Sequence, residues 1–258
     1  MRPGASAVLV TGGARRLGAA IVRRFAREGW HCVIHHKASI ADAEALRDEI
    51  VEAGGSASLC QFDLADAQAA QNGLEAVFAE VPQLTVLVNS ASVFEYDEAT
   101  LPSPAVWNHA LAVNTLAPVL LATTFQRLLP AEAKACVVNI LDQKLSNLNP
   151  DFFSYTVSKA ALQSASQIMA QALAPKVRVV NVAPGLVLPS GDQTLDEFEK
   201  SSLMNLLNRR TTLEDVAGGV FYVATEPYAT GQTLYIDSGQ SLSPHERDVM
   251  FLVRHEKA

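Results

Sequence analysis

Three ionisable side chains have types and spacing that suit proton transfer. Asp142 follows the apolar run CVVNI at 136–140, and the stretch FFSYTVSK then places Tyr155 and Lys159 one turn apart on one helical face. A phenol with an unperturbed pKa of ~10 exchanges protons poorly at neutral pH, whereas a neighbouring ammonium group favours its phenolate. Taken alone, the Tyr-x-x-x-Lys spacing better fits an ordinary surface pair, and Asp142 also fits a cap of its own loop. The elements around them therefore decide between chemistry and structure.

Short apolar runs alternate with longer amphipathic segments along the chain. The runs, rich in Val, Ile and Leu, are 7–11, 31–35, 58–62, 85–89, 136–140, 177–182 and 233–237. Strands that alternate with helices predict right-handed βαβ units, and continuous hydrophobicity predicts strands buried on both faces. No repeat or linker divides the 258 residues. We therefore expect one doubly wound α/β domain of Rossmann type over 1–258, with a seven-stranded parallel sheet and helices on both faces.

The first predicted strand ends in TGGARRLG at 11–18, a turn that suits a pyrophosphate. Gly12 and Gly13 turn the chain, and Gly18 begins a helix whose N-terminus can face an anion. A lone glycine cluster is a weak signal, because any tight turn between a strand and a helix uses glycine. Its position in the first such turn of an α/β domain makes a dinucleotide site the better interpretation.

The end of the second predicted strand indicates which dinucleotide binds. An acidic residue would hold the ribose 2′-hydroxyl of NAD there, but this chain has HHKAS at 35–39. Lys37, Ser39 and either Arg15 or Arg16 suit a 2′-phosphate, so the sequence predicts NADP(H). A basic, solvated turn is the alternative interpretation of this segment.

Together these residues resemble the short-chain dehydrogenase/reductase family over essentially the whole chain. The matching pieces are TGGARRLG, NSAS at 89–92, Asn114, Tyr155-x-x-x-Lys159 and APG at 183–185. The resemblance and the residue chemistry predict cofactor contacts at Gly12, Arg15, Arg16, Leu17, His36, Lys37, Ser39, Asp63, Leu64, Asn89, Ala91, Lys159, Pro184 and Gly185. Asp63 accepts equally well from an adenine amino group or from backbone N–H groups as a helix cap. The resemblance also implies that Asn114 orders a proton path through Lys159.

A narrower resemblance is to pteridine reductases and to the related dihydromonapterin and dihydrofolate reductases. Arg16 gives the cofactor turn the form TGxxxRxG, HHKAS is similar to their His-rich segment, and Asp142 replaces the usual catalytic serine. This implies a flat heterocyclic substrate. The predicted substrate contacts are Arg16, Phe94, Asp142, Tyr155 and Leu186, with Phe94 stacking on the ring or only anchoring its loop.

The expected activity is NADPH-dependent reduction of a C=N bond in a dihydropterin or dihydrofolate, with Tyr155 as proton donor and Asp142 helping to position or relay the proton. One alternative is a carbonyl reductase, including one that acts on 3-oxoacyl thioesters. A second alternative is an NADP-sensing protein without turnover. The intact Tyr155 and Lys159 pair argues against the sensor.

Composition excludes some partners. The net charge of −7 gives no reason to expect nucleic acid or an anionic membrane. No segment is expected to span a bilayer, and three cysteines in apolar runs fit a reducing compartment, so we expect a cytoplasmic protein. The six histidines have no metal spacing, so no metal is expected.

Two segments near the C-terminus have expected roles beside the site. Residues 186–210 are expected to form a substrate lid, with a short helix capped by Thr194. The tail 243–258 is expected to begin a helix at Ser243-Pro244 and either to cover a neighbouring subunit or to fray. The family resemblance implies a homotetramer.

Overall fold

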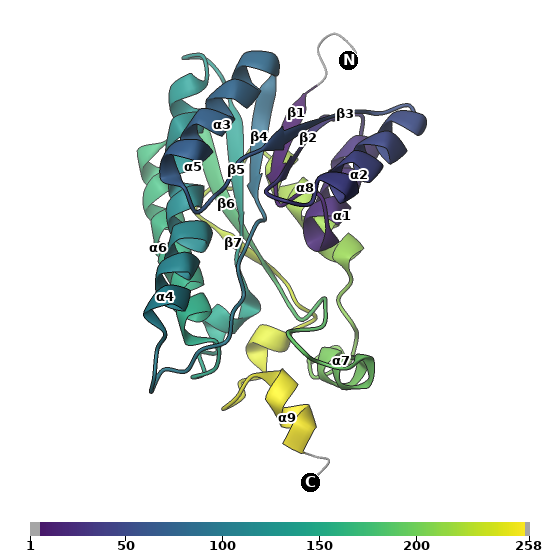
Figure 1. Ribbon diagram of the computed structural model, residues 1–258, viewed down its shortest axis with the longest axis vertical. Helices are drawn as coiled ribbons and strands as arrows, with labels where there is room; N and C mark the ends of the chain where they lie inside the picture. Colours follow the sequence, from purple (N-terminus) through teal and green to yellow (C-terminus); the bar gives the residue numbers. More distant parts are fainter. Residues whose placement is uncertain (1–5, 256–258) are drawn as a thin grey trace.

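A computed structural model describes residues 6–255, and its centre is a single sheet of parallel strands (Figure 1). The strands run in the order β3-β2-β1-β4-β5-β6-β7, and every neighbouring pair is parallel. Their bounds are β1 Ala7–Thr11, β2 His31–His36, β3 Ser56–Gln61, β4 Leu84–Asn89, β5 Ala135–Ile140, β6 Val177–Pro184 and β7 Thr233–Ile236. Each predicted apolar run overlaps one of these strands. The predicted doubly wound, seven-stranded parallel sheet is confirmed.

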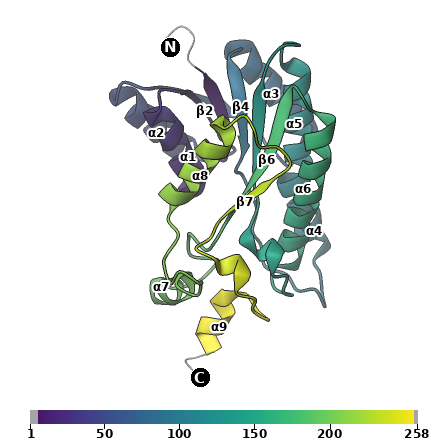
Figure 2. The ribbon, with the colours of Figure 1, turned by 180° about the vertical axis from the view of Figure 1, so that it is seen from behind.

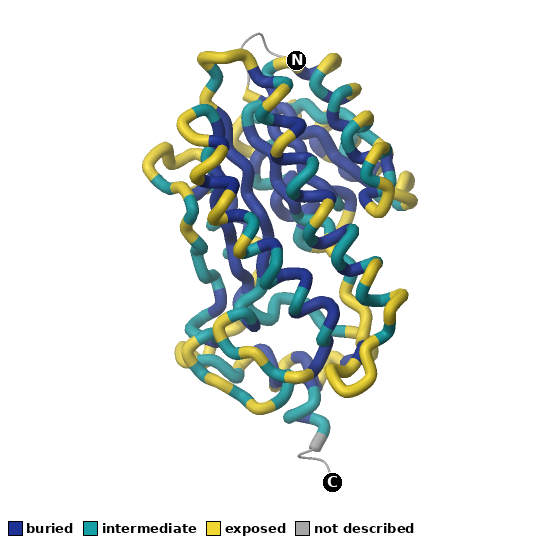
Figure 3. The backbone as a smooth tube through the Cα atoms, turned by 90° about the vertical axis from the view of Figure 1, so that its left-hand side faces the viewer, coloured by how far each residue is buried: buried dark blue, intermediate teal, exposed yellow. Residues whose placement is uncertain are grey.

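Helices cover both faces of this sheet (Figures 1 and 2). They are α1 Arg16–Arg27, α2 Ile40–Glu52, α3 Ala67–Glu80, α4 Pro104–Leu111, α5 Ala117–Leu128, α6 Phe153–Ala172, α7 Leu195–Ser202, α8 Leu213–Thr225 and α9 Val249–His255, with a π-helix at Ala112–Leu116 and 3-10 turns at Gln143–Ser146 and Gln240–Leu242. Helices α1, α2 and α8 share one apolar core with the sheet, and α3, α5 and α6 share a second. The buried strands between these two layers are visible in Figure 3. Burial on both faces explains the continuous apolar runs.

The register of the central strands places three strand ends side by side. Thr11 at the end of β1 lies opposite Asn89 of β4, and Asn89 lies opposite Asn139 of β5. The strand order reverses between β1 and β4, and ligands of such sheets bind beyond the strand ends at this point. Thr11 Oγ1 accepts hydrogen bonds from Ser90 N and Ala91 N at 3.0 and 3.1 Å, which fixes the loop after β4. The fold therefore provides a rigid edge for a binding site.

One helical stretch corrects an expectation about apolar length. Residues 104–128 form 25 consecutive helical residues, and an 18-residue window within them has a mean hydropathy of 1.3. By length and composition alone, this is enough to cross a membrane. The expectation that no segment reaches that length was wrong. The stretch packs into the second core through Val113, Ala117, Leu121, Ala122 and Phe125. Its apolar character is thus explained by packing on the sheet.

The lid and the tail lie together beyond the carboxyl ends of the strands (Figure 1). Thr194 caps α7 as predicted, because its Oγ1 accepts from Glu197 N and its own N–H donates to the Glu197 carboxylate. The predicted helix start at Ser243-Pro244 is wrong: α9 begins at Val249, where the Asp248 side chain accepts from Met250 N. Helix α9 packs against α7 of the same chain. The tail therefore covers its own subunit.

Candidate active site

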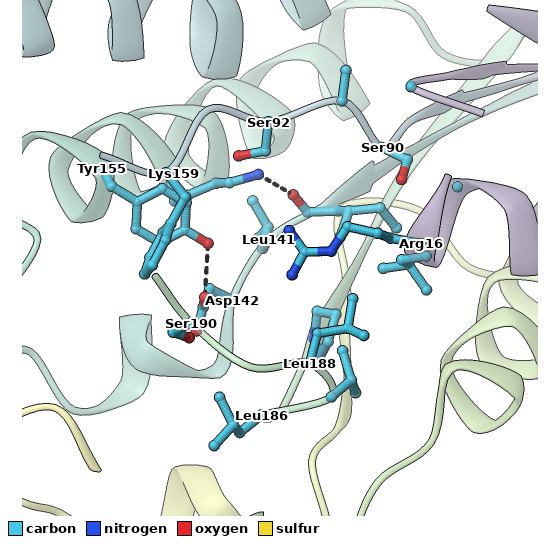
Figure 4. A pocket seen from close by; sticks show the side chains of 18 of the residues that line it. Arg16, Ser90, Ser92, Leu141, Asp142, Tyr155, Lys159, Leu186, Leu188 and Ser190 are labelled. Carbon is cyan, nitrogen blue, oxygen red and sulfur yellow. Dashed lines mark hydrogen bonds between the residues drawn. The ribbon is translucent and has the colours of Figure 1, made fainter. Parts of the chain in front are cut away.

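A cavity of about 990 Å³ opens at the carboxyl ends of the strands (Figure 4). Its walls come from the β1–α1 turn, the ends of β2 and β5, the loops after β4 and β6, helix α6 and the tail. The predicted site residues that line it are Gly12, Arg15, Arg16, Leu17, His36, Lys37, Ser39, Ala91, Phe94, Asp142, Tyr155, Lys159, Pro184, Gly185 and Leu186. Four predicted residues, Asp63, Leu64, Asn89 and Asn114, stand outside this lining. The fold thus brings most of the predicted site together.

Asp142 and Tyr155 form one hydrogen-bonded unit at the centre of the cavity (Figure 4). Tyr155 Oη donates to Asp142 Oδ2 at 2.7 Å. The second carboxylate oxygen, Oδ1, accepts from Lys144 N at 2.8 Å and caps the 3-10 turn that follows β5. The carboxylate therefore caps its loop, and the same loop aims it at the phenol.

Burial controls the ionisation of this unit. Burial raises the pKa of Asp142, although the hydrogen bonds from Lys144 N and from Tyr155 act to lower it. Burial and then the adjacent Asp142 carboxylate raise the pKa of Tyr155 well above 10. This direction of shift favours the protonated phenol at neutral pH, which is the form that can donate a proton.

Lys159 lies near the phenol and bonds to the backbone at the end of β5. Its Nζ donates to the Ile140 carbonyl oxygen at 2.8 Å and is 5.8 Å from the centre of the Tyr155 ring. Burial lowers the pKa of Lys159 to about 8. The ammonium group does not contribute to the raised pKa of Tyr155. Burial and the Asp142 carboxylate favour the protonated phenol here, so the expected effect of Lys159 on the phenolate stays a prediction.

Asn114 lies in the π-helical turn and is almost completely buried. Its side-chain oxygen accepts from Val93 N at 2.9 Å, and its Nδ2 donates to Ser158 Oγ at 3.0 Å. These bonds tie the loop after β4 to the residue before Lys159. Asn114 therefore positions the lysine through its neighbour, and no direct Asn114–Lys159 hydrogen bond is present.

The glycine turn has the close approaches that a bound diphosphate needs. A Cβ on Gly18 would lie 2.1 Å from the Gly12 carbonyl oxygen, and one on Gly12 would lie 3.0 Å from Ala91 Cα. Gly12 also has a φ of +62°, which favours glycine. Gly12 N donates to His35 Nδ1 at 3.1 Å, and His35 Nε2 donates to the Phe62 carbonyl at 3.0 Å. Neutral His35 therefore ties the turn to β2 and β3.

The end of β2 provides polar groups for the adenosine half of a dinucleotide. His36 is buried, and its Nδ1 has no hydrogen-bond partner among the described residues. Lys37 Nζ is 2.7 Å from Asp63 Oδ2, and the bond from Lys37 lowers the pKa of Asp63. Arg15 Nη2 is paired with Asp42 at 2.5 Å. Lys37 and Arg15 thus stand at the cavity, each beside a carboxylate.

Three remaining predicted contacts have structural partners. Asp63 Oδ1 accepts from Ala65 N, whereas α3 is capped by Asp66, so Asp63 caps a turn and not that helix. Leu64 packs in the second core. Asn89 Nδ2 donates to Asn139 Oδ1 at 2.8 Å, which joins the ends of β4 and β5.

The substrate side of the cavity combines an aromatic group with a cation. Phe94 stacks on Phe152 with ring centres 4.2 Å apart and meets the Tyr155 ring edge-on at 4.6 Å. Phe94 remains 38% exposed, so it anchors its loop and still presents surface to the cavity. Arg16 Nη2 donates to the Pro189 carbonyl of the lid at 3.3 Å. These groups suit a flat, polar-edged molecule.

The structure also brings to the site residues that the sequence did not indicate. Lys144 is buried two residues after Asp142, and Asp248 and Val249 of the tail line the cavity. Nothing in the loop letters DQK marks Lys144 as buried, and the tail is remote in sequence. Within residues 6–255 no cluster of His, Cys, Asp and Glu could hold a metal ion.

A family model and several known proteins are similar to this chain over most of its length. The family model for short chain dehydrogenase matches residues 6–200. FolM alternative dihydrofolate reductase 1 from Brucella suis, solved in complex with NADP, is 38% identical with a TM-score of 0.89, covering 95% of this chain and 98% of that chain. Dihydromonapterin reductase from Klebsiella pneumoniae is 27% identical over 245 residues, covering 91% of this chain and 96% of the relative. A 3-oxoacyl-[acyl-carrier-protein] reductase from Synechocystis is 27% identical over 239 residues, covering 91% and 96%.

Proposed function

The chain belongs to the short chain dehydrogenase family, and from this membership we propose that it is an NADPH-dependent reductase of a C=N bond in a dihydropterin or dihydrofolate. The observation that carries the proposal is the 2.7 Å hydrogen bond between Tyr155 and Asp142. A carboxylate at this position accepts N–H groups, which the amino-pyrimidine edge of a pterin presents. The similarity to FolM and dihydromonapterin reductases supports the same substrate class.

The cavity fits NADP(H), which solved relatives contain. The glycine turn leaves no room for side chains where a diphosphate would lie, and His36 lines the cavity at the end of β2. Lys37, Ser39 and Arg15 would hold the 2′-phosphate, and Lys159 would hold the nicotinamide ribose. When bound, NADPH supplies the hydride for the reduction.

The chain's own residues supply the proton and the orientation. Tyr155 keeps its proton because its pKa is raised, so it can donate to a ring nitrogen that gains electron density. Asp142 holds the phenol in place and, with a raised pKa, can take up a proton from solvent to restore it. Phe94 offers a face or edge to a flat ring, worth roughly 0.5–1.5 kcal/mol beyond its burial. Arg16 would hold a polar edge of the ring.

A second candidate is the reduction of a ketone, including a 3-oxoacyl thioester. The Synechocystis relative is named for that activity, and Tyr155 with Lys159 would serve it equally well. A carbonyl group, however, offers only acceptor lone pairs, so Asp142 in its ionised form would make no hydrogen bond with it. The carboxylate therefore favours the heterocycle.

Loss of NADPH absorbance with dihydrobiopterin, dihydrofolate and a panel of small ketones tests the proposal. We expect turnover with the bicyclic substrates at a kcat/KM at least tenfold above that for any ketone, about 1.4 kcal/mol of transition-state preference. Preference for ketones would overturn the pterin assignment. Tight NADPH binding without any turnover would instead identify a sensor.

We further propose that the protein is a cytoplasmic homotetramer. Leu116 and Ile168, on the helical layer formed by α4, α5 and α6, are 48% and 66% exposed, as apolar side chains at a subunit contact would be in a single chain. Multi-angle light scattering at micromolar concentration should give about four times the chain mass of 27.6 kDa. A mass of one chain would refute the assembly.

A further inference from the structure

The C-terminal tail is fastened beside the catalytic helix. Arg247 Nε and Nη2 donate to the Asp151 carboxylate at 2.8 and 2.7 Å, and Asp248 N donates to it at 2.8 Å. Asp151 is buried two residues before α6, the helix that carries Tyr155. The next tail residues, Asp248 and Val249, line the cavity. The Arg247–Asp151 latch thus fixes where the tail enters the site.

Lys144 also binds the tail through Asp248, and it contacts Asp151 as well. It is 5% exposed, and its Nζ donates to the Asp151 carbonyl at 2.8 Å and to Asp248 Oδ2 at 3.4 Å. Its backbone N–H meanwhile donates to Asp142 Oδ1 at 2.8 Å. One buried cation therefore connects the catalytic loop, the start of α6 and the tail.

Aromatic packing joins the tail to the loop that carries Phe94. Phe251 stacks near Phe152 at 6.2 Å and meets Tyr96 edge-on at 5.8 Å, while Phe152 stacks on Phe94. Met250 is buried with Phe152 and Tyr155. A displaced tail would therefore uncover the back of the aromatic group that faces the substrate side.

The far end of the tail reaches the lid. Arg254 Nη2 lies 2.7 Å from Asp192 Oδ1, and Arg254 Nε lies 3.5 Å from Glu197 Oε2 of α7. The tail thus spans the gap between the start of α6 and the lid, with the cavity on one side.

We propose that residues 247–251 form a wall of the substrate pocket in the same subunit and determine which substrates fit, with the Arg247–Asp151 pair as the latch that holds the wall closed. Val249 limits the width of the pocket, and Phe251 supports Phe94 through Phe152. This inference rests on the proposed function only in that substrate occupies this cavity. It holds for whichever class of substrate the enzyme reduces.

The test compares Arg247→Ala with Arg247→Lys and with a matched control, Arg23→Ala. Arg23 makes an equally bidentate pair with Glu49 at 2.8 and 2.7 Å, and its side chain is 40% exposed against 41% for Arg247. Steady-state kinetics use the best substrate of the wild-type enzyme. Arg247→Ala should raise its KM roughly tenfold, as expected for one lost charge-assisted pair. The kcat and the NADPH Kd should change less than about threefold, and Arg247→Lys should recover part of the loss.

Two further measurements keep the inference separate from the proposed function. Hydrogen–deuterium exchange of residues 248–252 should accelerate in Arg247→Ala and not in Arg23→Ala, whatever the substrate. Val249→Phe should raise the KM of a bicyclic substrate at least fivefold relative to a small one, because a larger side chain narrows the pocket. An unchanged KM in Arg247→Ala, an equal KM increase in Arg23→Ala, or an equal effect of Val249→Phe on both substrates would overturn the inference.

Discussion

Lys159 should make the enzyme lose activity at an unusually low alkaline pH. Burial lowers the pKa of its ammonium group to about 8, whereas an ordinary lysine titrates near ~10.4. The charged form donates to the Ile140 carbonyl and would hold the ribose of the cofactor. As pH rises through 8, the group becomes neutral and loses charge-assisted bonding.

The size of the effect follows from the titration. At pH 9, one unit above the folded pKa, about 10% of Lys159 remains charged, so kcat/KM should fall roughly tenfold from its value at pH 7. With an ordinary lysine, more than about 90% would remain charged at pH 9 and activity would hardly change. The measurement is the kcat/KM for the wild-type substrate between pH 6.5 and 10, with circular dichroism at each pH to show that the fold persists.

Lys159→Arg is the control, because a guanidinium stays charged throughout this range. Its activity, however low, should lack the decline centred near pH 8. A wild-type profile that stays flat to pH 9.5, or an identical decline in Lys159→Arg, would refute the assignment of this titration to Lys159.

Two further predictions concern the cofactor. Changing both Lys37 and Ser39 to alanine should raise the Kd for NADPH at least tenfold and the Kd for NADH less than about threefold. A hydrogen bond to a charged group contributes ~1.5–3 kcal/mol, and the side chain of Lys37 is 60% exposed. Equal weakening of both cofactors in fluorescence titrations would contradict a 2′-phosphate site. Gly18→Ala should abolish NADPH binding, because its Cβ would lie 2.1 Å from the Gly12 carbonyl oxygen, whereas Gly218→Ala, whose Cβ would meet Arg24 only at 3.7 Å, should bind normally. Wild-type affinity in Gly18→Ala would show that the turn does not cradle the cofactor.

The fold was predictable because its signals are local. Each buried strand corresponds to a continuous apolar run, and Gly12 and Gly18 mark a turn where side chains cannot fit. Thr194 followed by Glu197 specified a capping box within four residues. Patterns of this kind depend on neighbours in the sequence, so they can be recognised without knowledge of the tertiary structure.

The site was predictable only in part because several of its interactions are between distant segments. The pairing of Tyr155 with Asp142 could be expected from family resemblance, but the burial that raises both pKa values could not. The sequence places Lys144 in a loop, and its burial depends on contacts with the distant tail. The start of the tail helix was predicted wrongly, because Asp248 caps that helix. Asp248 and its neighbour Arg247 are held by Asp151, which lies nearly a hundred residues earlier in the sequence.

The substitution of Asp142 tests the central claim most directly, with dihydrobiopterin and a small ketone measured side by side from pH 5 to 8. Asp142→Asn should keep NADPH binding but lower dihydropterin turnover by roughly 10²–10⁴-fold, as expected when positioned acid/base help is lost. Asp142→Ser should lose dihydropterin reduction while it keeps or gains ketone reduction, because a hydroxyl can donate to a carbonyl. Wild-type dihydropterin turnover in Asp142→Asn across this pH range would show that the carboxylate only caps its loop, and would contradict the account.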